Sequence, residues 1–451
     1  MIKPYVKAQP SIPYLHPHFS MKAYRLIRTG AYLYIHSVLN LKTPRIIGME
    51  HLYEEFRNFQ AGRSRLIMTF RHISLNDPPI LGYTITKLLP LWCKKNDKKL
   101  QDVPNAHFLY GKDVLTYSGK FMQWLFPSMG YIPVINGKLY RQSLDDIREI
   151  LTTGRFPLIL APEGQVTYLT HRVSSIEKGM PKMTIWTSKE LNAKGEDKTI
   201  RILPLALGYH YEKNPEKKLR KIVYRLSRET GLMFQYQDSW YETWMDIFEK
   251  VIKYIETVFQ KNHPAAFKGY EPDPENRIAH LCDVLLRQGE GMAGLPAEGT
   301  ILERVFALRN LVQRQIFRED NEPCRMTPLE RIDADFCASE ARLIERYSQI
   351  VDLLEYLDPQ YIYPDCNRGR FLEFGMNLLD LVNRIKGGTI SSRYKPRKGK
   401  AFLLIGKATD ISNYLNNPEL SDKEKAEQIT EVIHSELANV STQLEAHLAF
   451  E

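Results

Sequence analysis

The apolar positions between residues 64 and 210 fall into short runs that alternate with amphipathic stretches. Buried strands are predicted at the runs 65–70, 106–111, 131–135, 156–161 and 200–208. The period of residues 144–154 predicts a helix between two of these strands. Alternation of this kind is typical of an α/β fold, so we expect a mixed, largely parallel sheet covered by helices.

Ahead of this region, residues 20–45 have the pattern of an aromatic-rich helix. Arg25 and Arg28 precede an apolar run of 11 residues at 31–41. This run is too short to cross a bilayer, which takes about 18 apolar residues, but it suits an interfacial helix. The same pattern also fits a helix that packs on the next domain, and the sequence leaves both interpretations open.

Beyond the Pro-rich and charged stretch at 261–277, helical periodicity dominates. Helices are predicted at 301–317, 338–357, 370–385 and 421–448. A basic, strand-like segment at 392–408 interrupts them without an evident role. We therefore expect three parts, which are an N-terminal amphipathic helical segment (1–50), an α/β domain (51–265) and an all-helical C-terminal module (270–451).

Composition and charge narrow the class of protein. Of the 451 residues, 43% are apolar and 25% are charged, which excludes disordered, collagen-like and polytopic membrane proteins. The net charge is +9, but residues 1–270 hold 40 basic and 23 acidic side chains, so the basic surplus lies entirely there. Such a surplus attracts nucleic acid, anionic lipid or an acidic carrier protein, or it forms a solvated face without a partner. Since no nucleic-acid-binding motif is present, we expect no nucleic-acid partner.

The cysteines and the N-terminus indicate the compartment. Five cysteines lie far apart without a C-x-x-C pair, so neither a disulfide framework nor a zinc site is predicted, and no metal is expected. The start, MIKPYVKAQP, lacks the apolar core of a signal peptide. We expect a cytoplasmic protein that associates with a membrane only peripherally.

The candidate chemistry begins in the segment 66–81. An apolar strand ends at Phe70, His72 follows it, and Asp77 stands before Pro78, where a helix is predicted to begin with Asp77 as its cap. This places His72 in a strand-to-helix loop at the carboxyl edge of the sheet, where α/β proteins bind ligands. If the loop folds back, Asp77 can orient the imidazole so that His72 acts as a general base. The plainer alternative is a cap and an unrelated loop residue.

Downstream features occur in the order of a known family. With His72 and Asp77 as a His-x4-Asp motif, the chain resembles the glycerolipid acyltransferase family of the lysophosphatidate acyltransferase type over about residues 50–215. The stretches that carry this resemblance are FLYGKDVLTYSGKFMQWLFPSMGYIPVING (108–137), LILAPEGQVTY (158–168), Lys178-Gly179 and ILPLAL (202–207). The resemblance implies the glycerolipid acyltransferase-like fold.

The resemblance also implies an activity. It implies O-acyl transfer from acyl-CoA or acyl carrier protein to a lysophosphatidate-like lipid hydroxyl in phospholipid biosynthesis, with His72 and Asp77 catalytic and no cofactor beyond the acyl co-substrate. Glu163, Gly164 and Lys178 would then bind the acceptor. The expected partners are an anionic membrane surface, the lipid acceptor and the acyl donor.

Two departures from the family pattern leave the acceptor open. Asn136 and Val166 stand where the family has phosphate-binding arginines, and Lys138 or Arg141 could substitute for the first. An acceptor other than lysophosphatidate is therefore conceivable. The alternative function is a non-catalytic lipid- or acyl-carrier-binding protein that keeps the acyltransferase fold.

Overall fold

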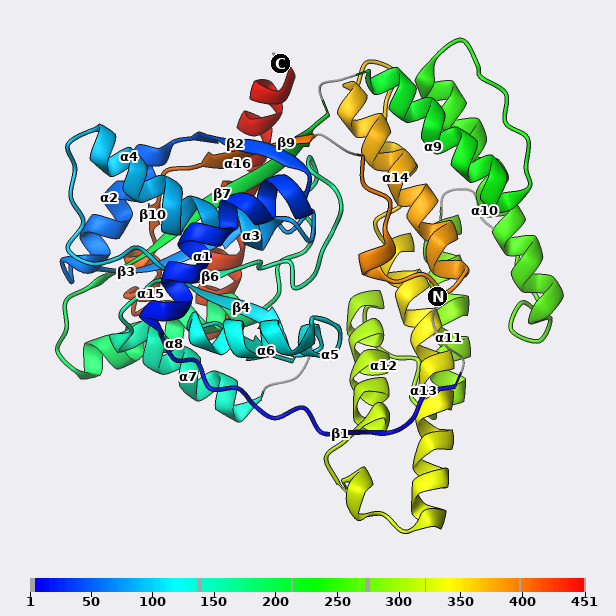
Figure 1. The fold of residues 1–451 in the computed structure, drawn as a ribbon, viewed down its shortest axis with the longest axis horizontal. Helices are drawn as coiled ribbons and strands as arrows, with labels where there is room; N and C mark the ends of the chain where they lie inside the picture. Colours follow the sequence, from blue (N-terminus) through cyan, green and yellow to red (C-terminus); the bar gives the residue numbers. More distant parts are fainter. Residues whose placement is uncertain are drawn as a thin grey trace. The chain divides into compact units, whose positions relative to one another are not determined.

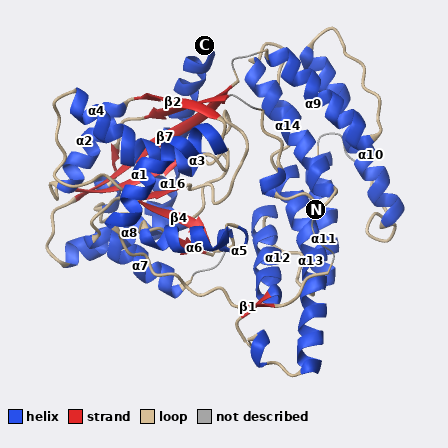
Figure 2. Ribbon diagram, viewed as in Figure 1, coloured by secondary structure: helices blue, strands red, loops and turns tan. Residues whose placement is uncertain are grey.

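A computed structural model describes residues 5–135, 140–211, 214–271, 276–320, 322–396 and 399–449. The chain divides into two compact units (Figure 1). The α/β unit consists of Tyr14–Lys213 and Arg397–Glu451, and the helical unit consists of Met1–Pro13 and Asn214–Pro396. Figure 2 shows most strands gathered in the α/β unit and long helices in the helical unit.

The α/β unit contains, among the described residues, an eight-stranded sheet. Its strands, in spatial order, are β2 (Leu41–Ile47), β9 (Gly399–Ile405), β7 (Thr199–His210), β3 (Ser64–Phe70), β6 (Leu158–Leu160), β4 (His107–Gly111) and β5 (Ile132–Val134), and β10 (Thr409–Asp410) pairs with β7. The five strands from β7 to β5 are parallel to one another, whereas β9 runs antiparallel to β7. The predicted α/β class and its largely parallel sheet are therefore confirmed, and each predicted strand overlaps one of these five.

Helices cover both faces of this sheet. They are α1 (Met21–Leu33), the π-helical η1 (Tyr34–Val38), α2 (Met49–Gln60), α3 (Asp77–Tyr83), the π-helical η2 (Thr84–Leu88), α4 (Leu89–Lys95), α5 (Val114–Tyr117), α6 (Gly119–Ser128), α7 (Arg141–Thr153), α8 (Gly179–Ala193), α15 (Ser412–Leu415) and α16 (Asp422–Ala449). Alternate residues of β3 point to opposite faces, as the two-residue period of a strand requires. Leu66 and Met68 join the core under α2, α3 and α4, whereas Ile67 joins the core under α7, α8 and α16 (Figure 1).

The last part of the chain belongs to the α/β unit. The strand-like segment at 392–408 contains β9, which lies between β2 and β7. After it, α16 packs on the sheet through Ile429, Ile433 and Leu437. The expected helical module at 270–451 is thus divided, because its strand and its final helix complete the core of the α/β unit. Conversely, residues 214–265, expected in the α/β domain, belong to the helical unit.

The N-terminal segment also differs from the predicted single helix. Residues Gln9–Pro10 form β1, which pairs in parallel with β8 (Phe317–Arg318) in the helical unit. The helix predicted at 20–45 ends at Val38, and the following residues form the strand β2. One side of helix α1 packs on α6, as expected if this helix packs on the next domain. No described helix is both long and apolar enough to span a membrane.

The helical unit is built from long amphipathic helices. They are α9 (Pro215–Thr230), α10 (Trp240–Asn262), α11 (Arg277–Ala293), α12 (Ile301–Ile316), α13 (Pro328–Leu354) and α14 (Arg368–Ile385), with 3-10 turns η3 (Pro323–Arg325), η4 (Pro359–Tyr361) and η5 (Ile390–Ser392). Three of these six, α12, α13 and α14, overlap helices that the sequence predicts. Helices α10 and α14 approach closely at Trp244, because a Cβ atom at Gly375 would lie 2.4 Å from its ring.

Candidate active site

Three neighbouring parallel strands bring the candidate residues to one edge of the sheet. Strand β3 lies between β7 and β6, so the carboxyl ends of all three share this edge. His72 follows β3, Glu163 follows β6, and Tyr209 lies at the end of β7. This is the edge at which α/β proteins bind their ligands.

The structure brings His72 and Asp77 together as the sequence predicts. The Nδ1 atom of His72 lies 3.0 Å from Oδ2 of Asp77, and the amide of Ser74 donates to the same oxygen at 2.8 Å. Asp77 is the first residue of α3, and its carboxylate accepts from the Ser74 amide in the preceding loop. It makes no capping hydrogen bond to α3, so the predicted role of Asp77 as a helix cap is wrong. The Asp77 side chain has no exposed surface, whereas 18% of the His72 side chain is exposed. The buried Asp77 therefore orients the imidazole of His72, which remains accessible from solvent.

A residue that the sequence analysis missed completes the environment of Asp77. The hydroxyl of Tyr209 donates a hydrogen bond to Oδ1, the oxygen that His72 does not use. Burial, and then the negative charge of Asp77, raise the pKa of Tyr209 well above its ordinary value. The hydroxyl consequently stays protonated and remains a donor.

Arg71, also missed, holds the loop that follows β6. It is almost fully buried, and its guanidinium donates to the carbonyl oxygens of Leu169 and Thr170, at 2.8 Å each, and to that of Arg172. It also lies 3.3 Å from Oε1 of Glu163. Because Arg71 immediately precedes His72, it links this loop to the base of the candidate dyad.

Glu163 is buried at the same edge. Its Oε1 atom accepts hydrogen bonds from Arg71 and from the Ser174 amide at 2.8 Å. Its Oε2 atom is also buried and has no hydrogen-bond partner among the described residues. Buried carboxylate oxygens are usually hydrogen-bonded, so this oxygen is an exception. Gly164 has φ +75°, and a Cβ atom there would lie 2.9 Å from Cγ of Glu177, so the turn after Glu163 requires glycine.

The other predicted acceptor residues do not gather around the dyad. Arg141 begins α7 with 95% of its side chain exposed and lies 4.0 Å from Asp145. Lys178 stands exposed immediately before α8. Neither contacts His72, Asp77 or Glu163 in the described part of the chain. Asn136 and Lys138 lie outside the described residues.

The position where the family has its second phosphate-binding arginine is closed to solvent. Val166 is buried in the loop that runs from Glu163 to Leu169, whose carbonyl oxygen accepts from Arg71. This loop is also tied to the dyad, because the Thr167 amide donates to the carbonyl oxygen of His72 at 2.8 Å. In this conformation the side chain of residue 166 points away from solvent, so this position does not offer a phosphate-binding group at the surface.

The arrangement can take a proton from a hydroxyl group that is not part of the protein. Nε2 of His72 has no hydrogen-bond partner among the described residues, so it is free to accept a proton. No described serine, threonine or cysteine side chain hydrogen-bonds to His72, and the nearby Ser74 hydroxyl instead accepts from the Asn76 amide. The geometry thus favours a base that acts on a bound alcohol over a covalent triad. Within the described ranges, no cluster of three His, Cys, Asp or Glu side chains could hold a metal ion.

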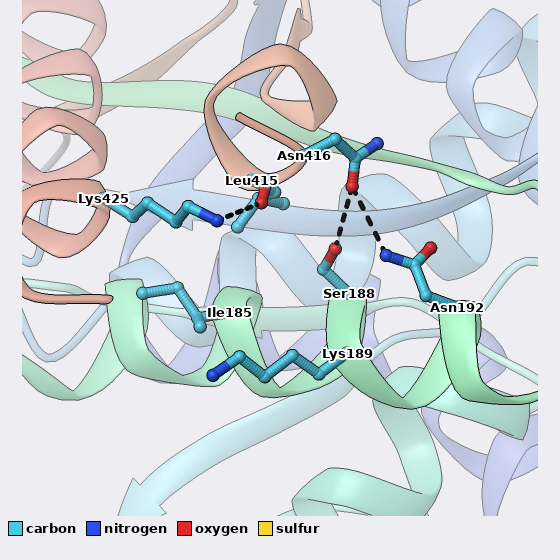
Figure 3. A pocket seen from close by; sticks show the side chains of 7 residues that line it. All are labelled: Ile185, Ser188, Lys189, Asn192, Leu415, Asn416 and Lys425. Carbon is cyan, nitrogen blue, oxygen red and sulfur yellow. Dashed lines mark hydrogen bonds between the residues drawn. The ribbon is translucent and has the colours of Figure 1, made fainter. Parts of the chain in front are cut away.

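A cavity of about 310 Å³ lies elsewhere in the α/β unit (Figure 3). It is lined by Ile185, Ser188, Lys189, Asn192, Leu415, Asn416 and Lys425. The polar groups there already pair with the protein, since Lys425 donates to the carbonyl oxygen of Leu415 at 2.8 Å and Ser188 to Asn416 at 3.4 Å (Figure 3). No predicted site residue lines this cavity, and it adds nothing to the chemistry of the dyad.

Comparison of the chain with protein-family models and with curated protein sequences found no match. The dyad, its supporting residues and the surrounding loops are therefore the features of the chain that bear on its function.

Proposed function

We propose that the protein is an O-acyltransferase that moves a fatty acyl group from acyl-CoA or an acyl carrier protein to a lipid hydroxyl. The observation that carries this proposal is the His72–Asp77 pair, in which Nδ1 and Oδ2 lie 3.0 Å apart and Nε2 has no hydrogen-bond partner in the described part of the chain. Tyr209 and Ser74 hold Asp77 from two further directions, so the imidazole is oriented before a substrate binds. Such preorganisation is what a general base needs.

In the proposed reaction, Nε2 of His72 takes the proton as the acceptor's O–H bond breaks. The oxygen attacks the thioester carbonyl carbon and forms a tetrahedral intermediate. The C–S bond then breaks, and the leaving thiolate receives the proton from the imidazolium. Asp77 stabilises the imidazolium between these two steps.

Glu163 supports an acceptor site beside the dyad. Its carboxylate has no exposed surface, so in this proposal it shapes the site by holding the Arg71 guanidinium and the Ser174 amide and does not bind the acceptor directly. Arg71 positions this carboxylate and is linked through the backbone to His72. The acceptor in this proposal is a lysophosphatidate-like lipid, whose phosphate site would have to be supplied by residues other than Val166.

A second candidate is a non-catalytic protein that binds a lipid or an acyl carrier on the same fold. The observations that favour it are the burial of Val166 and the outward position of Arg141, which together leave no arginine at the expected phosphate positions among the described residues. The intact His72–Asp77–Tyr209 arrangement favours the enzyme, because a binding protein has no need of an oriented base.

We also propose that the α/β unit contacts membranes peripherally through α1 and η1, in the cytoplasm. Leu33 and Val38 expose 64% and 65% of their surface there, although α1 packs on α6 with its opposite side. Arg25 is exposed on the same helix and can meet anionic head groups.

The direct test is an acyl-transfer assay with the purified full chain. Labelled acyl-CoA and acyl carrier protein would each be offered with lysophosphatidate, other lysolipids and simple alcohols. The proposal expects a labelled ester with one lipid acceptor at least, and release of free thiol in equal amount. Tight lipid or carrier binding without ester formation across the panel would favour the binding protein instead.

A further inference from the structure

The helical unit carries an exposed surface that combines basic and apolar side chains. It consists of the outer face of α9 and the loop 231–239, and we call it the α9 surface. The stretch 214–240 contains six basic and three acidic residues. Lys217, Arg220, Lys221 and Tyr224 recur at helical spacing and are exposed, whereas the opposite side of α9 is buried against α14.

The loop after α9 holds large apolar side chains in solvent. Met233 exposes 89% of its surface and Tyr236 exposes 46%. The loop runs back along the helix, because the guanidinium of Arg220 lies 4.5 Å from the ring centre of Tyr236, and Trp240 donates to Glu216 at 3.1 Å. The apolar and basic groups thus belong to one surface.

Hydrogen bonds at both ends hold this loop in its conformation. Gly231 ends α9 in the left-handed region with φ +76°, and the Leu232 amide donates to the Thr230 hydroxyl at 3.2 Å. At the other end, the amide of Gln237 donates to the Thr243 hydroxyl at 3.0 Å. The exposure of Met233 is therefore a property of the folded loop, and the entropy cost of ordering it on binding is small.

From these observations we infer that the α9 surface docks on an anionic lipid bilayer. Its basic row matches anionic head groups, while Met233 and the ring of Tyr236 fit the boundary between head groups and acyl chains. Two of the three carboxylates in this stretch do not oppose this field, because Glu216 lies near Arg220 and Arg368, and Glu229 pairs with Arg228 and Lys386. The third, Asp238, is exposed at the end of the loop, where the six basic residues of the stretch outnumber it. An acidic protein partner would use the basic row but has no need of a rigid apolar tip in water, so the bilayer fits both features. This inference does not rest on the proposed acyl transfer.

The test is sedimentation of the full chain with vesicles of three parts phosphatidylcholine to one part phosphatidylglycerol, and with pure phosphatidylcholine. We expect K217E/K221E to weaken binding to the anionic vesicles by about twentyfold at low salt, and the loss should shrink as salt rises from about 0.05 to about 0.5 M. Met233→Ser should weaken binding about fivefold at both salt concentrations, whereas Met233→Leu should retain it. The matched control is K261E/K268E, which makes the same charge change at exposed lysines at and beyond the far end of α10.

Each variant is also compared in a Leu33→Ser/Val38→Ser background, so that binding through η1 cannot conceal the effect. Equal losses from K217E/K221E and K261E/K268E would overturn the inference, since net charge alone would then explain the binding. Unchanged binding of Met233→Ser would overturn it as well, because the apolar tip would then take no part in the contact with the bilayer.

Discussion

The hydroxyl of Tyr209 donates a hydrogen bond to Oδ1 of Asp77, while the imidazole of His72 occupies Oδ2. The carboxylate therefore has a fixed orientation that does not depend on His72 alone. Tyr209 comes from β7 and His72 from the loop after β3, so two neighbouring strands define the dyad.

We expect Tyr209→Phe to lower kcat by about tenfold, because one hydrogen bond to a charged acceptor contributes about 1.5 kcal/mol. The KM for the acceptor should change little, since the hydroxyl faces Asp77. Steady-state kinetics at several acceptor concentrations separate the two quantities, with the exposed Tyr224→Phe as control. A kcat equal to that of the unaltered protein would show that Tyr209 does not position the dyad.

Glu163 is expected to have two separable roles. Glu163→Ala should lower the free energy of unfolding of the α/β unit by about 3 kcal/mol, because it leaves the buried Arg71 guanidinium without its carboxylate. Glu163→Gln keeps an acceptor oxygen for Arg71 but removes the charge, and we expect it to raise the acceptor KM about tenfold with a smaller loss of stability. Denaturant unfolding and kinetics on both variants check this. A stability loss in both with an unchanged KM would make Glu163 a structural turn residue only.

Membrane binding through η1 is best tested by substitution, because deletion of residues 1–45 would remove the start of β2, where Leu41 pairs with Gly399. Leu33→Ser/Val38→Ser should remove most of the binding that remains at high salt. Replacement of Arg25 should instead weaken binding at low salt only, by about 1 kcal/mol. Sedimentation with anionic and neutral vesicles distinguishes these effects. Undiminished binding of the double variant at high salt would contradict this part of the proposal.

The stability of the helical unit should depend on Glu355. Burial, and then the nearby Asp352, raise the pKa of Glu355 to about 7, and one of its carboxylate oxygens has no hydrogen-bond partner among the described residues. Between the unfolded pKa of about 4.3 and about 7, the folded state binds more protons, so this group lowers the free energy of unfolding as pH rises through that window.

Glu355→Gln should therefore stabilise the helical unit at pH 8 by on the order of 2–3 kcal/mol and have little effect at pH 4.5. The exposed Glu298→Gln is the control, and denaturant unfolding at both pH values is the measurement. A stabilisation of equal size at both pH values would show that ionisation is not its cause.

The sequence predicted what is local and missed what is distant. The buried parallel strands β3 and β7 read as continuous apolar runs, and His72 and Asp77 are five residues apart, so both could be predicted. Strand β2 was predicted as helix because it is an edge strand whose charged residues and Pro44 interrupt the apolar pattern. Strand β9 pairs with β7 across nearly 200 residues, a separation that no local pattern reveals.

The supporting residues of the site were missed for the same reason. Tyr209 bonds to Asp77 across 132 residues, and Arg71 meets Glu163 across 92. A charged residue between an apolar strand and His72 was a usable signal for Arg71, because an arginine at such a position must find partners when it is buried. The sequence around Tyr209 holds no such signal, because an aromatic residue at the end of a strand is common and does not indicate a polar partner.

The measurement that tests the central claim most directly is the acyl-transfer rate of His72→Ala, with the exposed His434→Ala as matched control and Asp77→Asn beside it. The account predicts that His72→Ala loses about a thousandfold or more in kcat/KM while its unfolding curve and vesicle binding stay unchanged, and that His434→Ala is fully active. Asp77→Asn should lose less, because it removes the orientation of the base and leaves the base itself. A folded His72→Ala variant that transfers acyl groups at the rate of the unaltered protein would contradict the account.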